Sequence, residues 1–123
     1  MKSIAVIENN RDNRLLLRAI LGETYNILEY ETGFEALAAF QQHLPDLVLL
    51  DIALPGMDGV EVLQRMRDTQ ATRELPVIAI TAHAMTGDRE RFLSAGFDDY
   101  ISKPIIDERL LLNTIEAWLQ KRK

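Results

Sequence analysis

The chain has 123 residues, of which 47% are hydrophobic and 27% are charged, a composition typical of one globular domain of ordinary size. It contains no cysteine, which excludes disulfides, thiol catalysis and cysteine-based zinc sites. The formal net charge of −5 argues against a general nucleic-acid surface, and no apolar run approaches the roughly 18 residues that a membrane span needs. We therefore expect a single cytoplasmic domain over residues 1–123, with no nucleic-acid or membrane partner.

Apolar strand-like runs alternate with helix-like segments along the whole chain. The predicted elements in chain order are strand 3–8, helix 11–22, strand 26–31, helix 34–43, strand 46–51, helix 59–69, strand 76–81, helix 86–95, strand 98–102 and helix 107–121. Repeated strand–helix units need right-handed crossovers, which give an α/β, doubly wound, flavodoxin-like fold with five parallel strands in the order 2-1-3-4-5. The second strand is more polar than the others, which predicts an edge position.

The first helix has an apolar stripe that predicts its inner face. Leu16, Ala19 and Ile20 recur at helical spacing, and Gly22 is placed to end the helix in a left-handed conformation. Asp58 and Asp107 are the predicted N-caps of the third and fifth helices. The apolar residues at helical spacing in the second, third and fifth helices are Phe34, Leu37, Phe40 and Leu44, then Val60, Leu63 and Met66, then Leu111, Ile115, Trp118 and Leu119.

Chemically active side chains stand where four predicted strands end. Glu8 and Asp51 end the first and third strands, Thr81 ends the fourth, and Lys103 follows the fifth. The C-terminal ends of parallel strands meet at one edge of the sheet, and ligands bind there in open α/β folds. Core packing does not require such residues at four strand ends. We therefore expect them to form one site.

Four segments carry a more specific pattern, namely Glu8-Asn9-Asn10, Leu50-Asp51 with Pro55-Gly56-Met57-Asp58-Gly59, Thr81-Ala82, and Tyr100-Ile101-Ser102-Lys103-Pro104. In these segments the chain resembles the receiver domain of two-component response regulators, in the family's order and over essentially the whole chain. The stretch 79–88 is similar to single-domain, DivK-like regulators. The resemblance therefore implies a stand-alone receiver with no output domain.

The resemblance implies that Asp51 accepts a phosphoryl group from a phosphohistidine on a sensor histidine kinase or a histidine phosphotransferase. The phosphorylated chain would switch a protein-binding surface toward a downstream protein target. It would be a signalling module and not an enzyme, promoting only its own phosphoryl transfer or dephosphorylation. The remaining implied roles are phosphoryl binding by Thr81, Ala82 and Lys103, Mg²⁺ binding by Glu8, Asn9, Asp51 and the Ala53 carbonyl, a conformational switch at Thr81 and Tyr100, and a cis peptide at Lys103-Pro104.

Asn9 departs from the family, most members of which have an acid there that contacts Mg²⁺. An amide oxygen can still coordinate the ion, but it brings no charge, so we expect weaker Mg²⁺ binding than is usual. Fewer like charges also predict a less raised pKa at Asp51. His83 lies two residues after Thr81, where it either controls the access of water to the phosphoryl group or is an ordinary exposed loop histidine.

Three other functions are compatible with parts of the pattern. Asn9 is compatible with a pseudo-receiver, an adaptor that binds proteins without being phosphorylated. An aspartate-nucleophile phosphatase usually has a second aspartate two residues after the first, where this chain has Ala53. A flavin carrier would share the fold, but the first strand is followed by Asn9-Asn10-Arg11-Asp12 and not by a phosphate loop rich in Gly, Ser and Thr.

Overall fold

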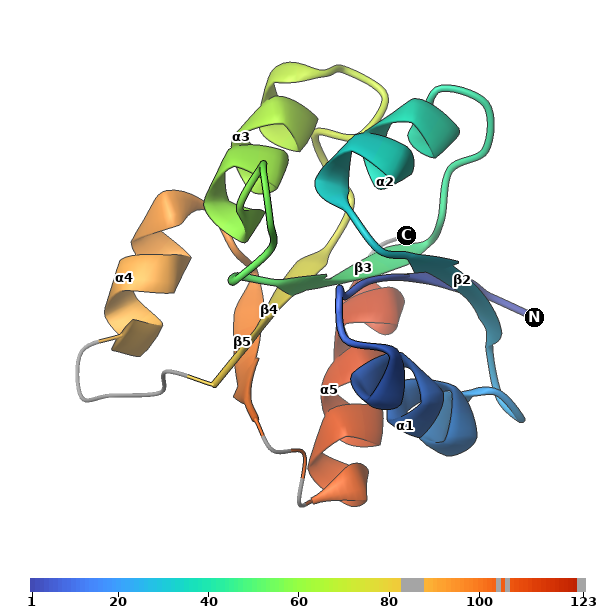
Figure 1. The fold of residues 1–123 in the computed structure, drawn as a ribbon. Coiled ribbons are helices and arrows are strands. Elements are labelled where there is room, and N and C mark those ends of the chain that lie inside the picture. Colours follow the sequence, from blue (N-terminus) through green and yellow to red (C-terminus); the bar gives the residue numbers. More distant parts are fainter. Residues whose placement is uncertain (83–87, 104, 106, 122–123) are drawn as a thin grey trace.

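A computed structural model describes residues 1–82, 88–103, 105 and 107–121. Strands and helices alternate along these residues, as predicted (Figure 1). The elements are β1 (Ser3–Ile7), α1 (Arg11–Leu21), β2 (Asn26–Tyr30), α2 (Gly33–Phe40), β3 (Leu47–Asp51), α3 (Gly59–Asp68), β4 (Val77–Thr81), α4 (Asp88–Ala95), β5 (Asp99–Ser102) and α5 (Glu108–Lys121).

The five strands form one parallel sheet in the order β2-β1-β3-β4-β5, which confirms the predicted topology and the edge position of β2. Helices α1 and α5 cover one face of this sheet, and α2, α3 and α4 cover the other (Figure 1). The register pairs Ile7 with Leu50, Asp51 with Ile80, and Thr81 with Ser102. The C-terminal ends of these strands therefore lie next to one another along one edge of the sheet.

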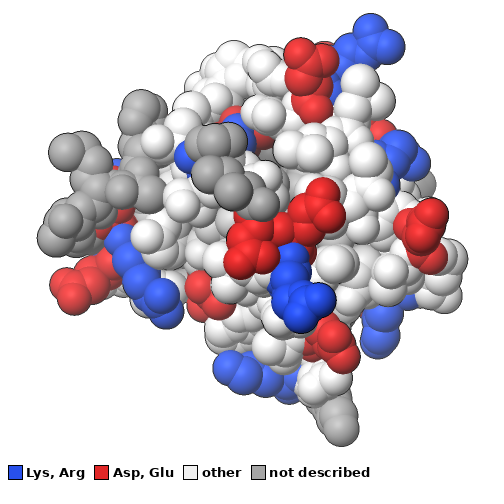
Figure 2. All heavy atoms as spheres, turned by 90° about the horizontal axis from the view of Figure 1, so that it is seen from below, with Lys and Arg blue, Asp and Glu red and all other residues white. Residues whose placement is uncertain are grey.

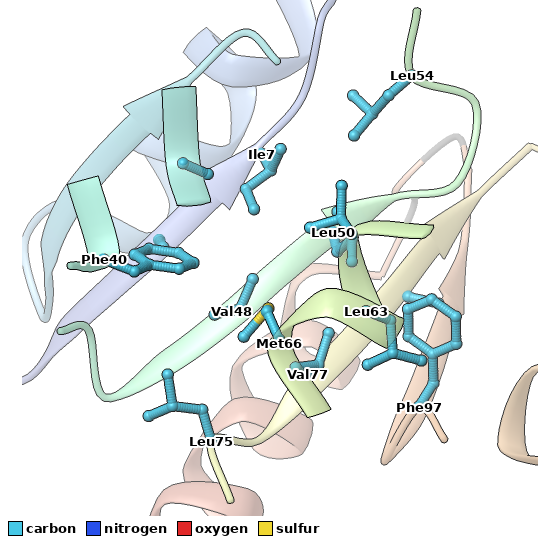
Figure 3. Close-up of a cluster of buried hydrophobic side chains, with 14 of the residues drawn as sticks. Ile7, Phe40, Val48, Leu50, Leu54, Leu63, Met66, Leu75, Val77 and Phe97 are labelled. Atoms are coloured by element: carbon cyan, nitrogen blue, oxygen red, sulfur yellow. The ribbon is translucent and has the colours of Figure 1, made fainter. Parts of the chain in front are cut away.

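Each face of the sheet has its own hydrophobic core. Val48 and Leu50 of β3 face α2 and α3, whereas Leu47 and Leu49 face α1 and α5. Figure 3 shows the first of these cores, in which side chains of α3 pack over β3 and β4. All five residues of β3 and of β4 are buried, which explains why both strands are continuous apolar runs up to their last residue.

The predicted inner face of α1 is only partly correct, because Ile20 packs against the core but Leu16 and Ala19 are exposed. Leu16 is 39% exposed, and the buried stripe of the helix consists of Arg14, Leu17 and Leu21. Leu17 and Leu21 supply the apolar contacts of this stripe, and Arg14 continues it because its charge finds partners inside the fold. Gly22 was expected to be left-handed, but it has φ −67° and ψ −19°, so α1 ends with a right-handed residue.

Helix α2 is shorter than predicted, and its buried residues are Gly33, Ala36 and Phe40. Helical structure ends at Phe40, which is buried, whereas Phe34 is 58% exposed and Leu44 is 42% exposed. The predicted caps are confirmed. Asp58 Oδ1 accepts a hydrogen bond from the Glu61 N–H at 2.9 Å, and Asp107 Oδ1 accepts one from Leu110 at 3.1 Å.

Charges of both signs are spread over the surface. On the face drawn in Figure 2, described Lys and Arg side chains lie among Asp and Glu side chains and do not gather into one broad basic area. Over the part of the chain that the structure describes, every helix is too short or too polar to cross a membrane.

Candidate functional site

The four strand-end residues meet at one edge of the sheet. Glu8, Asp51 and Thr81 are three of the few buried polar residues, with exposed fractions of 2%, 6% and 2%. The Lys103 Nζ lies 3.3 Å from Asp51 Oδ2 and also forms an ion pair with Glu8 Oε1. The Lys103 N–H donates to the Thr81 carbonyl at 2.7 Å. The structure therefore brings together all four residues, with the lysine ammonium between the two carboxylates.

The loop after β3 fixes the orientation of Asp51. The Ala53 N–H donates to Asp51 Oδ1 at 3.2 Å, and the Gly59 N–H donates to the Ile52 carbonyl at 2.9 Å. A Cβ atom at Gly59 would lie 2.4 Å from the Asp51 carbonyl oxygen and 2.7 Å from Ile52 Cα. Only glycine lets the start of α3 approach the backbone of the acidic residue so closely.

The loop after β1 holds Glu8. The Asn10 N–H donates to Glu8 Oε2 at 3.1 Å, while Asn10 Oδ1 caps α1 by accepting from the Asn13 N–H at 3.0 Å. The Arg14 side chain donates to the carbonyls of both Glu8 and Asn9. Sequence reasoning missed Arg14. The available signal was an arginine at helical spacing from Leu17 and Leu21, inside what proved to be the buried stripe.

The two carboxylates have different ionisation properties. Burial, together with the hydrogen bond and the negative charge of Glu8, raises the pKa of Asp51, and the Lys103 charge only partly opposes this. Burial also acts to raise the pKa of Glu8, but hydrogen bonds with Lys103, Asp51 and the Asn10 N–H outweigh it and leave that pKa lowered. The shared environment therefore pushes the pKa values of the two coupled carboxyl groups apart, with that of Asp51 raised and that of Glu8 lowered.

The other predicted site residues lie around this centre. Asn9, Ala53 and Ala82 are exposed in the loops that follow β1, β3 and β4. Tyr100 is partly buried on β5, and its ring centroid is 6.2 Å from that of Phe92 in α4. His83 and Pro104 lie outside the described residues, so the predictions for His83 and for the cis peptide at Lys103-Pro104 stay predictions.

The donor atoms at this edge suit a hard cation. Glu8 Oε1 is buried, and its close partner among the described residues is the Lys103 ammonium, with which it forms an ion pair. Oxygen atoms of Asp51, Asn9 and Ala53 are the other available donors, and Mg²⁺ prefers oxygen ligands while keeping several waters. In the described ranges, no three or more His, Cys, Asp or Glu side chains are grouped so that they could hold a metal. Any ion bound here would therefore meet two carboxylates and not three.

Comparisons with known proteins agree with this geometry. The family model described as the response regulator receiver domain matches residues 4–116. The polar-differentiation response regulator DivK of Brucella ovis is 41% identical over 119 residues, which cover 96% of both chains.

Solved structures extend the likeness. The receiver domain of a sensor histidine kinase from Pseudomonas aeruginosa PAO1, described with a magnesium ion coordinated in its active-site cleft, has a TM-score of 0.87 and 31% identity, covering 97% of this chain and 98% of that one. The signal receiver domain of a histidine kinase from Syntrophus aciditrophicus has a TM-score of 0.90 and 28% identity, covering 100% and 93%. With its sheet order, its strand-end acids and these relatives, the chain belongs to the response regulator receiver domains of two-component signalling.

Proposed function

We propose that Asp51 is the phosphoacceptor of this receiver domain and that the donor is a phosphohistidine on a sensor histidine kinase or a histidine phosphotransferase. One observation carries the proposal, namely the Lys103 ammonium 3.3 Å from Asp51 Oδ2 at the end of a buried strand. In the transfer, the bond between phosphorus and the imidazole nitrogen breaks. A bond from phosphorus to a carboxylate oxygen of Asp51 forms, and the imidazole keeps the electron pair of the broken bond.

The surrounding residues are suited to stabilise the transferred group. Phosphoryl transfer depends mainly on positioning and on positive charge near the phosphoryl oxygens. Lys103 already contacts Asp51, so its ammonium can pair with a phosphoryl oxygen after a small movement. Thr81 ends the neighbouring strand β4 and would donate a hydrogen bond to another oxygen. Ala82, the next residue, is small and would leave room for the group.

Glu8, Asp51, Asn9 and the Ala53 carbonyl would hold Mg²⁺, as the magnesium ion in the cleft of the Pseudomonas relative suggests. When bound, this ion supplies positive charge to the phosphoryl oxygens. Because Asn9 contributes no charge, we expect weak binding and a requirement for more Mg²⁺ than a receiver with three acids would need.

The phosphorylated domain would signal through a protein contact. A phosphoryl group adds roughly −1.5 to −2 charges at the site. Thr81 would move toward that charge and Tyr100, which packs beside Phe92, would turn into the vacated space. The surface near α4, β5 and α5 would then change its affinity for a downstream protein target. Such a module turns over no external substrate, and a histidine kinase partner implies a cytoplasmic location.

The test is labelling with a small phosphodonor in the presence of Mg²⁺, read by intact mass. We expect one phosphoryl adduct on the parent chain and none on Asp51→Asn, which preserves the size of the side chain. Removal of Mg²⁺ by a chelator should abolish labelling of the parent. A folded parent chain that takes no adduct even at high Mg²⁺ would instead support the pseudo-receiver, an adaptor that works without phosphorylation.

A further inference from the structure

We infer that Arg14 is a positioning residue for the acidic site, acting through the backbone of Glu8 and Asn9; this inference rests on the proposed function of that site. Arg14 lies in the first turns of α1, and its side chain is only 11% exposed. Its Nη1 donates to the Glu8 carbonyl at 2.8 Å and to the Asn9 carbonyl at 3.0 Å. One nitrogen therefore joins two consecutive peptide groups of the loop that carries the acid.

The other side of the guanidinium is held by β2 and the residue that follows it. Arg14 Nε lies 3.3 Å from Glu29 Oε1, and Nη2 lies 3.3 Å from Glu31 Oε1. These two carboxylates compensate the buried positive charge, which explains how an arginine can occupy the inner stripe of α1. The planar guanidinium thus links the edge strand to the β1–α1 loop.

This arrangement has a consequence for the site itself. Glu8 and Asn9 are two of the residues proposed to hold Mg²⁺, and the directions of their side chains depend on the backbone that Arg14 fixes. Replacing a residue that orients a metal ligand without touching the metal typically weakens metal binding about 10- to 100-fold. A lysine could keep the charge, but it lacks the planar, multi-donor geometry that joins two carbonyls and two carboxylates at once.

Arg18 provides a matched control on the same helix. It pairs with Glu29 at 2.5 Å, so it shares one carboxylate with Arg14. Among the described residues, the other hydrogen bond of its side chain goes to the Ile27 carbonyl at 3.4 Å, on β2 and away from the β1–α1 loop. A substitution at Arg18 therefore removes a similar charge from the same network without touching the loop that carries Glu8.

The experiment compares Arg14→Gln and Arg14→Lys with Arg18→Gln and the parent chain. Mg²⁺ is titrated while backbone amide NMR shifts of the β1–α1 loop are followed, and phosphodonor labelling is measured as a function of Mg²⁺ concentration. We expect both Arg14 variants to bind Mg²⁺ about tenfold more weakly. The labelling rate of the Arg14 variants at saturating Mg²⁺ should stay within about twofold of the rate of the parent. The Mg²⁺ affinity of the control Arg18→Gln should also stay within about twofold of that of the parent.

A role confined to stability would lower the urea midpoint of the Arg14 variants and leave the Mg²⁺ affinity of the folded protein unchanged, and this result would overturn the inference. Equal weakening by Arg18→Gln would overturn it too, because a general loss of charge would then explain the effect. If Arg14→Gln does not fold, Arg14→Lys decides the question, since it keeps the charge and the apolar stem. A parent that binds Mg²⁺ but takes no phosphoryl label would refute the proposed function, while weaker Mg²⁺ binding by the Arg14 variants would still support the role of Arg14.

Discussion

Replacing Lys103 with methionine tests the electrostatic structure of the site most directly. The substitution keeps an unbranched apolar stem and removes the ammonium that contacts two carboxylates, whose side chains are 2% and 8% exposed. At the observed 3.3 Å, the attraction between Lys103 and Asp51 is about 5 kcal/mol for an effective dielectric constant of about 20, and about 1.3 kcal/mol for that of water, about 80. The contact lies between these limits because the lysine side chain is itself 16% exposed.

The expected net cost is about 2 kcal/mol of unfolding free energy at pH 7, below the roughly 3–5 kcal/mol of a fully buried broken pair. The cost is limited because one of the two carboxylates can take up a proton once the cation is gone. Without the lysine the carboxyl pKa values rise in the folded state, so the folded variant binds more protons than the parent. The deficit should therefore shrink as the pH falls toward about 4.5.

Urea denaturation of the parent and of Lys103→Met at both pH values measures this cost. Lys2→Met, at an exposed position, should change the unfolding free energy by less than about 0.5 kcal/mol. In an Asp51→Asn background the cost of Lys103→Met should fall by about 1 kcal/mol or more, because one of the two uncompensated charges is gone. An equal cost in both backgrounds, or a deficit that grows as the pH falls, would refute the electrostatic reasoning.

Three further substitutions have expected outcomes that urea denaturation can measure. Asp51→Asn should stabilise the chain at neutral pH, because burial raises the pKa of Asp51 and so disfavours its charged form in the folded state. The gain in unfolding free energy should vanish below about pH 4, where the carboxyl group is protonated in both states, and a gain that increases in acid would contradict this. Gly59→Ala should lower the unfolding free energy by about 2 kcal/mol and slow phosphodonor labelling, because the added methyl group would overlap the backbone at Asp51. Unchanged stability and labelling would show that the loop can shift freely. Arg67→Met should lower the unfolding free energy by about 2–3 kcal/mol, because Arg67 donates hydrogen bonds to four acceptors within 3.0 Å. The control Arg65→Met removes an exposed ion pair with Glu61 and should lower it by less than about 0.5 kcal/mol.

The order of the elements and the location of the site follow from local sequence patterns. Four apolar residues before Asp51 predict a strand buried on both faces, and the structure buries all of β3. The polar character of 26–31 predicts an edge strand, and β2 is at the edge. Because parallel strands end at one edge, alternation of strands and helices alone was enough to predict that Glu8, Asp51, Thr81 and Lys103 would meet.

The inner face of α1 could not be predicted in the same way. Leu16 belongs to an apolar stripe, yet it is partly exposed, while Arg14 is buried. The partners that allow this burial are Glu29 and Glu31, which are distant along the chain, and the carbonyls of the β1–α1 loop. Hydropathy treats every arginine alike, because it contains no information about which acceptors the folded chain brings near it.

Apolar runs and their periods, which are local properties, therefore determined the elements, the parallel sheet and the edge where the acids gather. Tertiary structure alone decided that Arg14 supports the backbone of Glu8 and that the pKa of Glu8 is lowered although this side chain is buried. Both outcomes depend on burial and on hydrogen-bond partners from distant parts of the chain. Such contacts exist only once the sheet and its helices have packed together.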